Sequence, residues 1–241
     1  MKKLSIIIPA YNEEKTIAEV INRIKKVDLK KQFIEKEIIV VDDGSKDNTS
    51  NKVSAIKGVK LFNQVSNQGK GAAIRRGIKE STGDIVLVQD ADLEYDPEDY
   101  SSLIQPILDG RAQVVYGSRF LGSKNKGNRI LSRKHKNAYS LAYMGAQIVT
   151  FATNILFGTR ITDEPTCYKC FKAEVIKSIR IRGNRFNWEP EVTAKVAKKG
   201  IKIYEVPIFY NPRSFEEGKK INWRDGVQAI WTLLKYKIKN D

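Results

Sequence analysis

The sequence predicts an α/β protein built on a mainly parallel sheet flanked by helices. In the first half of the chain, short runs rich in Val and Ile alternate with segments of helical periodicity, which is typical of crossover units in parallel sheets. In addition, clusters of polar residues follow the expected strands. With 241 residues, of which 41% are hydrophobic and 29% charged, the chain can form one folded domain with appendages.

Each element is expected from its local pattern. The strands of the first half are expected at residues 4–9, 37–42, 59–64, 84–89 and 114–118. The helices between them are expected at residues 16–27, 49–57, 71–81 and 96–109, the last one capped by Asp96 with Pro97 at its first position. The second half predicts a long helix at 134–157, a strand at 168–172, a helix from Pro190 to 199 and a strand at 202–206.

The C-terminal segment predicts an amphipathic helix. Its apolar residues recur at helical spacing and are Trp223, Val227, Ile230, Trp231, Leu234 and Ile238. Such a stripe most often packs on the protein's own core, but two tryptophans beside lysines also fit a helix that lies in a membrane interface. The uncharged stretch 139–159 is too polar for a transmembrane helix, and we expect a surface or interfacial helix there.

Polar residues gather directly after the first four expected strands. The segments are residues 11–13, 42–44, 67–70 and 90–92. Parallel strands bring their carboxyl ends to one edge of a sheet, and ligands of open α/β sheets bind outside that edge. We therefore expect these four segments to form one ligand site.

Two of these segments carry carboxylates suited to a nucleotide and a metal. Asp90 and Asp92 can both face one cation if the chain turns between them, and Mg²⁺ and Mn²⁺ prefer such oxygens together with substrate phosphate. The alternative is an acidic turn that caps the next helix. Asp43 can accept hydrogen bonds from a ribose or base, or it can simply stabilise a turn. Neither a G-x-G-x-x-G nor a G-x-x-x-x-G-K-[ST] motif is present, so dinucleotide and P-loop sites are not supported.

Ordered motifs in the chain resemble those of family 2 glycosyltransferases. They are Ser5-Ile-Ile-Ile-Pro9-Ala-Tyr11-Asn-Glu13, Val40-Val41-Asp42-Asp43-Gly44-Ser45, Asn67-Gln-Gly69-Lys70-Gly71 and Gln89-Asp90-Ala91-Asp92. Further motifs are similar to the branch of polyprenol (dolichyl) phosphate mannose and glucose synthases, namely Tyr116-Gly-Ser118-Arg119, Phe186-Asn-Trp-Glu189-Pro-Glu191 and Glu205-Val-Pro207-Ile-Phe-Tyr210. The resemblance covers nearly the whole chain. It implies the A-type glycosyltransferase fold and an inverting, metal-dependent transfer of a hexose from a nucleotide-diphosphate sugar.

The resemblance also implies roles for individual residues. Pro9, Tyr11, Glu13, Val41 and Asp43 are expected around the base and ribose. The expected diphosphate and metal site consists of Gly69, Lys70, Asp90, Ala91, Asp92 and Glu94, with Asp90, Asp92 and Glu94 on the metal side and Asp92 as a catalytic residue. Mg²⁺ or Mn²⁺ is the expected cofactor, and GDP-mannose and UDP-glucose are the leading donors.

The charge distribution points to the acceptor. The formal net charge is +15, and the interval between Asp109 and Asp163 contains no acidic residue but does contain Arg119 and Arg133. A lipid phosphate is already anionic, so it needs guidance by cations rather than a general base. In the resembling synthases, the positions of both arginines contact phosphate. The sequence therefore predicts a polyprenyl phosphate acceptor, with Arg119 among the catalytic residues.

Other functions remain open at this point. A sugar or protein hydroxyl acceptor would need a base, for which Asp163, Glu189 and Glu191 are candidates; Asp163 is retained as a catalytic candidate. If the acceptor is a phosphate, the exchange of Asp163 for Asn is expected to change turnover little. A nucleic-acid-binding protein would fit the charge alone, but no DNA- or RNA-binding motif is present. Cys167 and Cys170 have a redox or zinc-site spacing, yet with a single histidine in the chain we expect two inert thiols.

The last expectations concern organisation and location. Residues 1–210 are expected to form the catalytic domain, and residues 211–241 an acceptor loop and the C-terminal helix. In that loop, Arg213 and Lys219 are expected to close over the diphosphate. The N-terminus shows no signal-peptide pattern, so we expect a cytoplasmic protein that is peripheral on the inner face of the membrane.

Overall fold

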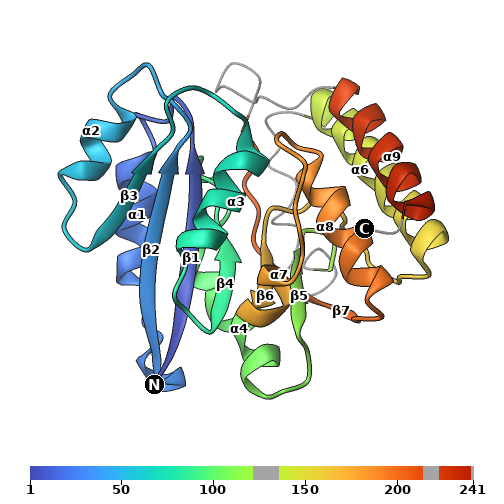
Figure 1. Cartoon of the computed structure of the whole chain (residues 1–241), viewed down its shortest axis with the longest axis horizontal. Coiled ribbons are helices and arrows are strands. Elements are labelled where there is room, and N and C mark those ends of the chain that lie inside the picture. The colour runs from blue at the N-terminus through green and yellow to red at the C-terminus, as the bar shows by residue number, and fades with distance from the viewer. Residues whose placement is uncertain (122–135, 214–222, 240–241) are drawn as a thin grey trace.

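One mixed sheet carries the functional edge of the protein. The computed structural model describes residues 1–121, 136–213 and 223–239, with side chains from 143 onward in the second range. Within these ranges, seven strands form a sheet in the order β3-β2-β1-β4-β6-β5-β7 (Figure 1). They are β1 (Lys2–Ala10), β2 (Ile34–Asp42), β3 (Val59–Asn63), β4 (Ile85–Val88), β5 (Val114–Ser118), β6 (Lys169–Lys172) and β7 (Ile203–Pro207). Only β6 runs antiparallel to its neighbours, so the expected mainly parallel sheet is confirmed.

The central strands are apolar on both faces because helices cover both sides of the sheet. In β1, Leu4, Ile6, Ile7 and Ile8 are fully buried, and every residue of β4 is buried. Such near-continuous apolar runs are typical of parallel strands between helical layers. The buried residues hold the strands in place between the helices, and the polar residues that follow each strand lie at the edge of the sheet.

Helices cover the sheet and extend beyond β7. They are α1 (Ile17–Lys26), α2 (Thr49–Ser54), α3 (Lys70–Glu80), α4 (Tyr100–Leu108), α6 (Lys136–Phe157), α7 (Ala173–Lys177), α8 (Trp188–Lys198) and α9 (Trp223–Ile238). Helix α3 packs on β1 and β2, and α4 packs on β5 and β6. Helices α6, α8 and α9 pack on one another, and Figure 1 shows α6 and α9 side by side at the end of the molecule away from β3.

The strand directions explain why distant segments meet. In β1, β2 and β3 the carboxyl ends are level, because Ala10 pairs with Asp42 and Asp42 with Asn63. At the other side of the sheet, Ser118 at the end of β5 pairs with Pro207 at the end of β7. The reversed strand β6 has its amino end at this same edge. The segment that leads into β6 therefore joins the segments that follow the parallel strands.

Several boundaries differ from the expectation. Asp96 does cap the segment after β4, accepting a hydrogen bond from the Glu98 backbone N–H, but the first turn is the 3₁₀ helix η2 (Pro97–Asp99) before α4. Helix α8 begins at Trp188, so Pro190 lies in its first turn, where a missing N–H costs no helical hydrogen bond. The short η1 (Lys30–Gln32) and α7 were not predicted, because they are too short to show a hydrophobic period.

The C-terminal helix packs on the body through Leu233, Tyr236 and, of the predicted stripe, Ile230. Leu233 and Tyr236 are buried against α6 and α8, and the Tyr236 hydroxyl donates a 2.8 Å hydrogen bond to Glu191. Most of the stripe is exposed, with Trp223 at 75% and Trp231 at 68%, so packing on the protein's own core is the wrong interpretation for these residues. Within the described residues, no helix is both long and apolar enough to cross a membrane. The boundary placed at residue 210 stays a prediction.

Candidate active site

Asp43 organises the loops at the carboxyl ends of β2 and β3. Its carboxylate accepts hydrogen bonds from the Gln64 side chain at 2.6 Å and from the backbone N–H groups of Gln68 at 2.8 Å and Gly69 at 2.7 Å. Burial raises the pKa of Asp43, and the backbone hydrogen bonds oppose that rise. Gly69 has φ +102°, and a Cβ there would lie 2.3 Å from the Asn184 carbonyl oxygen, so glycine is required. Asp43 thus fixes the entry to α3.

The expected base and ribose residues lie on adjacent strand ends. Pro9 on β1 pairs with Val41 on β2, which is fully buried. Tyr11 is partly exposed just beyond β1, and Glu13 follows it with its backbone N–H bonded to the Thr49 hydroxyl at 2.8 Å. The structure therefore brings these residues and Asp43 together at one end of the edge, and their contact with a nucleotide stays a prediction.

Lys70 is a buried cation at the first turn of α3. Its Nζ atom lies 2.8 Å from Asp90 and 3.2 Å from Glu189. Burial alone would lower the pKa of Lys70, but the two carboxylates outweigh it and raise the pKa, so the amine stays charged. Glu189, one of the possible bases, is thereby held in an ion pair. Glu191, the other, accepts from the Gly183 backbone N–H at 2.5 Å and from Tyr236, and it serves the packing of α8.

Asp92 and Glu94, which are expected on the metal side of the site, lie in one turn after β4. A turn with Leu93 at φ +65° lets the Asp92 carboxylate accept a 3.1 Å hydrogen bond from the Glu94 backbone N–H. Burial, followed by the neighbouring Asp90 and Glu94 carboxylates, raises the pKa of Asp92 to about 7, while Arg213 opposes that rise. Crowded carboxylates of this kind fit a hard divalent cation.

The described residues do not by themselves complete a metal shell. Among them, no group of three or more His, Cys, Asp or Glu side chains is close enough to hold an ion. Mg²⁺ is commonly held by one or two carboxylates plus substrate phosphates. Asp90 and Asp92 fit that arrangement, in which the diphosphate supplies further oxygens.

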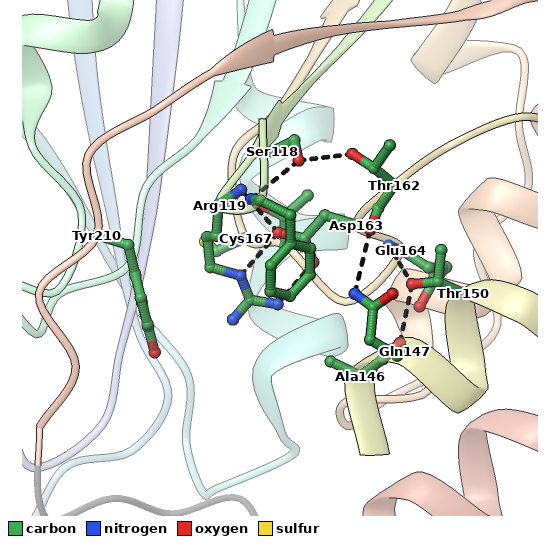
Figure 2. A network of polar contacts seen from close by, with 12 residues as sticks. Ser118, Arg119, Ala146, Gln147, Thr150, Thr162, Asp163, Glu164, Cys167 and Tyr210 are labelled. Carbon is green, nitrogen blue, oxygen red and sulfur yellow. Dashed lines mark hydrogen bonds and ion pairs between the residues drawn. The ribbon is translucent and has the colours of Figure 1, made fainter. Parts of the chain in front are cut away.

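Arg119 and Asp163, two residues expected to act on the acceptor, form a buried ion pair. Arg119 follows β5, and its Nε and Nη2 atoms both donate to Asp163 at 2.7 Å, as does its backbone N–H at 3.0 Å (Figure 2). The Asp163 backbone N–H in turn donates to Glu205 on β7 at 3.1 Å. Burial would lower the pKa of Arg119, but Asp163 outweighs it and raises the pKa. The paired edge of the guanidinium is fixed, and its other N–H groups can bind an anion.

Tyr210 links the two sides and was not among the predicted site residues. Figure 2 shows it on the side of Arg119 away from Asp163, with the Arg119 guanidinium carbon 5.1 Å from the ring centroid. Its hydroxyl donates a 2.7 Å hydrogen bond to Glu94. Its place at the end of the Glu205 to Tyr210 motif was the only signal in the sequence.

Arg213 and the two cysteines lie within the described residues, whereas two other expected positions do not. Arg213 lies in the site and bonds to the metal-side carboxylates. Arg133 and Lys219 lie outside the described residues. Cys167 and Cys170 are buried, free thiols, and burial raises the pKa of both, as expected for inert cysteines.

Known proteins resemble this chain over most of its length. The family model described as glycosyl transferase family 2 matches residues 5–180. A UDP-N-acetylglucosamine–dolichyl-phosphate N-acetylglucosaminyltransferase of Methanococcus voltae is 31% identical, with 98% of this chain and 97% of the relative covered. A dolichyl-phosphate β-glucosyltransferase of Trichomonas vaginalis is 32% identical, over 98% of this chain and 73% of its own. The dolichol-phosphate mannosyltransferase of Pyrococcus furiosus is 30% identical, over 90% of this chain and 59% of its own.

Solved structures confirm the fold. Glucosyl-3-phosphoglycerate synthase of Mycobacterium tuberculosis, in complex with Mg²⁺ and uridine diphosphate, has a TM-score of 0.73 and 23% identity, covering 100% of this chain and 81% of that one. A complex of that enzyme with Mn²⁺, UDP-glucose and phosphoglyceric acid gives a TM-score of 0.71 at 22% identity, with 100% and 81% covered. The expected A-type fold is thus confirmed. Together with the site, these findings show that the chain belongs to glycosyltransferase family 2, as a nucleotide-sugar glycosyltransferase related to the dolichyl-phosphate sugar transferases.

Proposed function

We propose that the protein transfers a hexose, with inversion, from GDP-mannose or UDP-glucose to a polyprenyl or dolichyl phosphate at the cytoplasmic face of a membrane. The observation that carries the proposal is the buried Arg119–Asp163 pair, whose charged guanidinium packs on the ring of Tyr210, the residue that donates its hydroxyl hydrogen bond to Glu94. Relatives named for dolichyl phosphate support the acceptor class, and the structural neighbours with Mg²⁺ or Mn²⁺ support a divalent cofactor.

The proposed reaction needs no proton acceptor. A phosphate oxygen of the lipid attacks the anomeric carbon from the face opposite the leaving group, the bond from that carbon to the diphosphate breaks, and a nucleoside diphosphate departs. Arg119 orients the acceptor phosphate, Lys70 and Arg213 supply positive charge beside the donor, and Asp90 and Asp92 would hold the cation. When bound, the cation neutralises charge that develops on the leaving diphosphate.

A hydroxyl acceptor is the weaker alternative because the candidate bases are already engaged. Both oxygens of Asp163 accept from Arg119, and Glu189 pairs with Lys70. A hydroxyl acceptor could reach either carboxylate only by displacing the cation bonded to it. A phosphate acceptor avoids that requirement.

The proposal is tested with a panel of nucleotide sugars, Mn²⁺ and a short polyprenyl phosphate, scoring released nucleotide and lipid product together. We expect one donor to give stoichiometric lipid product. The matched control acceptor is the same polyprenol without its phosphate, which we expect to give none. Transfer to the free polyprenol or to a sugar hydroxyl, with the phosphate inactive, would contradict the proposal.

The exposed apolar face of α6 and α9 is proposed to bind the lipid surface. Its large side chains are Tyr143, Met144, Ile148, Phe151 and Ile155 on α6, and Trp223, Val227, Trp231, Leu234 and Ile238 on α9. The two helices pack against each other, and lysines 235, 237 and 239 at the end of α9 are exposed. An apolar face of this size with adjacent lysines and a net charge of +15 fits anionic lipid.

Vesicle flotation tests this membrane contact. We expect the protein to float with anionic vesicles, and the double change Phe151→Glu and Trp231→Glu to reduce partition by at least about tenfold, because each apolar side chain contributes roughly 1.5–3 kcal/mol when buried. The control is Phe33→Glu. Phe33 is also exposed, but it directly follows η1 and does not belong to α6 or α9. Equal flotation of the double variant, or self-association through this face without lipid binding, would contradict membrane docking.

A further inference from the structure

Arg213 is held at the metal side of the site by its backbone as well as its side chain. The segment after β7 reaches this side through a bridge between Tyr210 and Tyr95. The backbone N–H of Asn211 then donates to the Glu94 carbonyl oxygen at 2.8 Å, and the backbone N–H of Arg213 donates to the Glu94 carboxylate at 3.0 Å. These hydrogen bonds fix the backbone of Arg213 next to Glu94.

Its guanidinium contacts three carboxylates, two from the turn after β4 and one from the segment after β1. The Nη2 atom lies 2.8 Å from Asp92, the Nε atom 3.4 Å from Glu94 and the Nη1 atom 3.6 Å from Glu13. The Arg213 side chain is 18% exposed and the acids 10–14%, so solvent screens these contacts only in part. The guanidinium therefore lies among the carboxylates of Glu13, Asp92 and Glu94.

A divalent cation at Asp92 has to compete with this contact. One Asp92 oxygen accepts from the Glu94 backbone N–H, and the other is the oxygen bonded to Arg213. Asp90 differs, because its cation is the buried Lys70 on α3.

We propose that Arg213 is the resident counter-cation of Asp92 and Glu94, and that a divalent cation and the Arg213 guanidinium bind Asp92 alternatively. Binding of the metal to Asp92 then releases the guanidinium. The released guanidinium binds the diphosphate of the donor, which enters the site together with the metal. Arg213 is therefore a positioning residue that couples metal binding to donor binding. This inference rests on the proposed metal-dependent function.

The test is Mn²⁺ binding to the full chain without nucleotide, followed by electron paramagnetic resonance and calorimetry at fixed pH and ionic strength. Arg213→Gln is expected to bind Mn²⁺ about tenfold more tightly than the wild type, because a charge-assisted hydrogen bond of the competitor is lost. Arg213→Lys, which keeps the charge, is expected to stay near the wild type. The control is Arg111→Gln, which removes a charge paired with Asp109 at the amino end of β5 and is expected to leave Mn²⁺ affinity unchanged.

A nucleoside diphosphate provides the second arm. With it present, the gain of Arg213→Gln is expected to vanish or reverse, because the variant lacks the guanidinium that contacts the diphosphate in the wild type. Unchanged or weaker Mn²⁺ binding by folded Arg213→Gln, while Asp92→Asn abolishes binding, would overturn this inference and leave the metal site standing. No Mn²⁺ binding by the wild type or any variant, with or without nucleotide, would overturn the metal site and this inference together.

Discussion

Replacing Asp92 with asparagine is expected to lower the rate of sugar transfer about a thousandfold. A metal that stabilises a leaving group contributes several kcal/mol to the transition state, and about 1.4 kcal/mol corresponds to a factor of ten. Asp92 is the proposed metal ligand next to Glu94, and burial together with the neighbouring Asp90 and Glu94 carboxylates raises its pKa to about 7. The measurement is kcat over a range of Mn²⁺ concentrations at saturating donor.

The matched control is Asp109→Asn, which removes an exposed carboxylate at the opposite edge of the sheet and is expected to keep the wild-type rate. Thermal unfolding of both variants separates catalysis from stability. A rate near that of the wild type for Asp92→Asn would exclude Asp92 from the chemistry. Full recovery at high Mn²⁺ would limit its role to metal affinity.

The second large effect is expected on the acceptor side. Arg119→Lys keeps a cation next to buried Asp163 but loses the two-bond geometry, and Asp163→Asn keeps the arginine but loses the charge that orients it. Charged hydrogen bonds contribute about 1.5–3 kcal/mol, so each variant is expected to raise KM for polyprenyl phosphate roughly 10- to 100-fold. The KM for the donor is expected to stay unchanged. Steady-state kinetics with each substrate varied in turn measures both constants.

Arg111→Lys is the control for the arginine change, since that residue pairs with Asp109 far from the site. The sequence alone predicted that Asp163→Asn would change turnover little with a phosphate acceptor. The structure leads to a larger expected effect, because Asp163 holds Arg119 in place. If Asp163 were instead the base for a hydroxyl acceptor, kcat would fall by several orders of magnitude with little change in acceptor KM, and that result would refute the role assigned here.

The strand–helix pattern and the polar strand ends were predictable because they depend on local sequence. Strands such as β1 and β4 are runs of buried apolar residues, and β5 was predicted with its observed bounds. The direction of β6 and the short helix α7 were not predicted. The direction of β6 depends on its neighbours, and the helix α7 has only five residues, too few to show a period.

For the site, the sequence identified most of the charged residues but not their pairing. It singled out Arg119 and Asp163 separately, 44 positions apart, and their ion pair arises only because β6 enters the sheet at the edge where β5 ends. Tyr210 was quoted only as part of a motif, since nothing local shows that its ring would lie beside Arg119 and its hydroxyl on Glu94. The amphipathic stripe of α9 was visible, but its exposure was not.

The sequence by itself determined the fold class, the family resemblance and the residues at the strand ends, because burial of apolar runs and motif spacing are properties of short segments. The tertiary structure alone decided which charges meet. Ion pairs such as Lys70 with Asp90 and Arg213 with Asp92 join residues 20 and 121 positions apart, and only the order and direction of the strands bring them within hydrogen-bonding distance. The electrostatics of this site is therefore a property of the sheet edge rather than of any one motif.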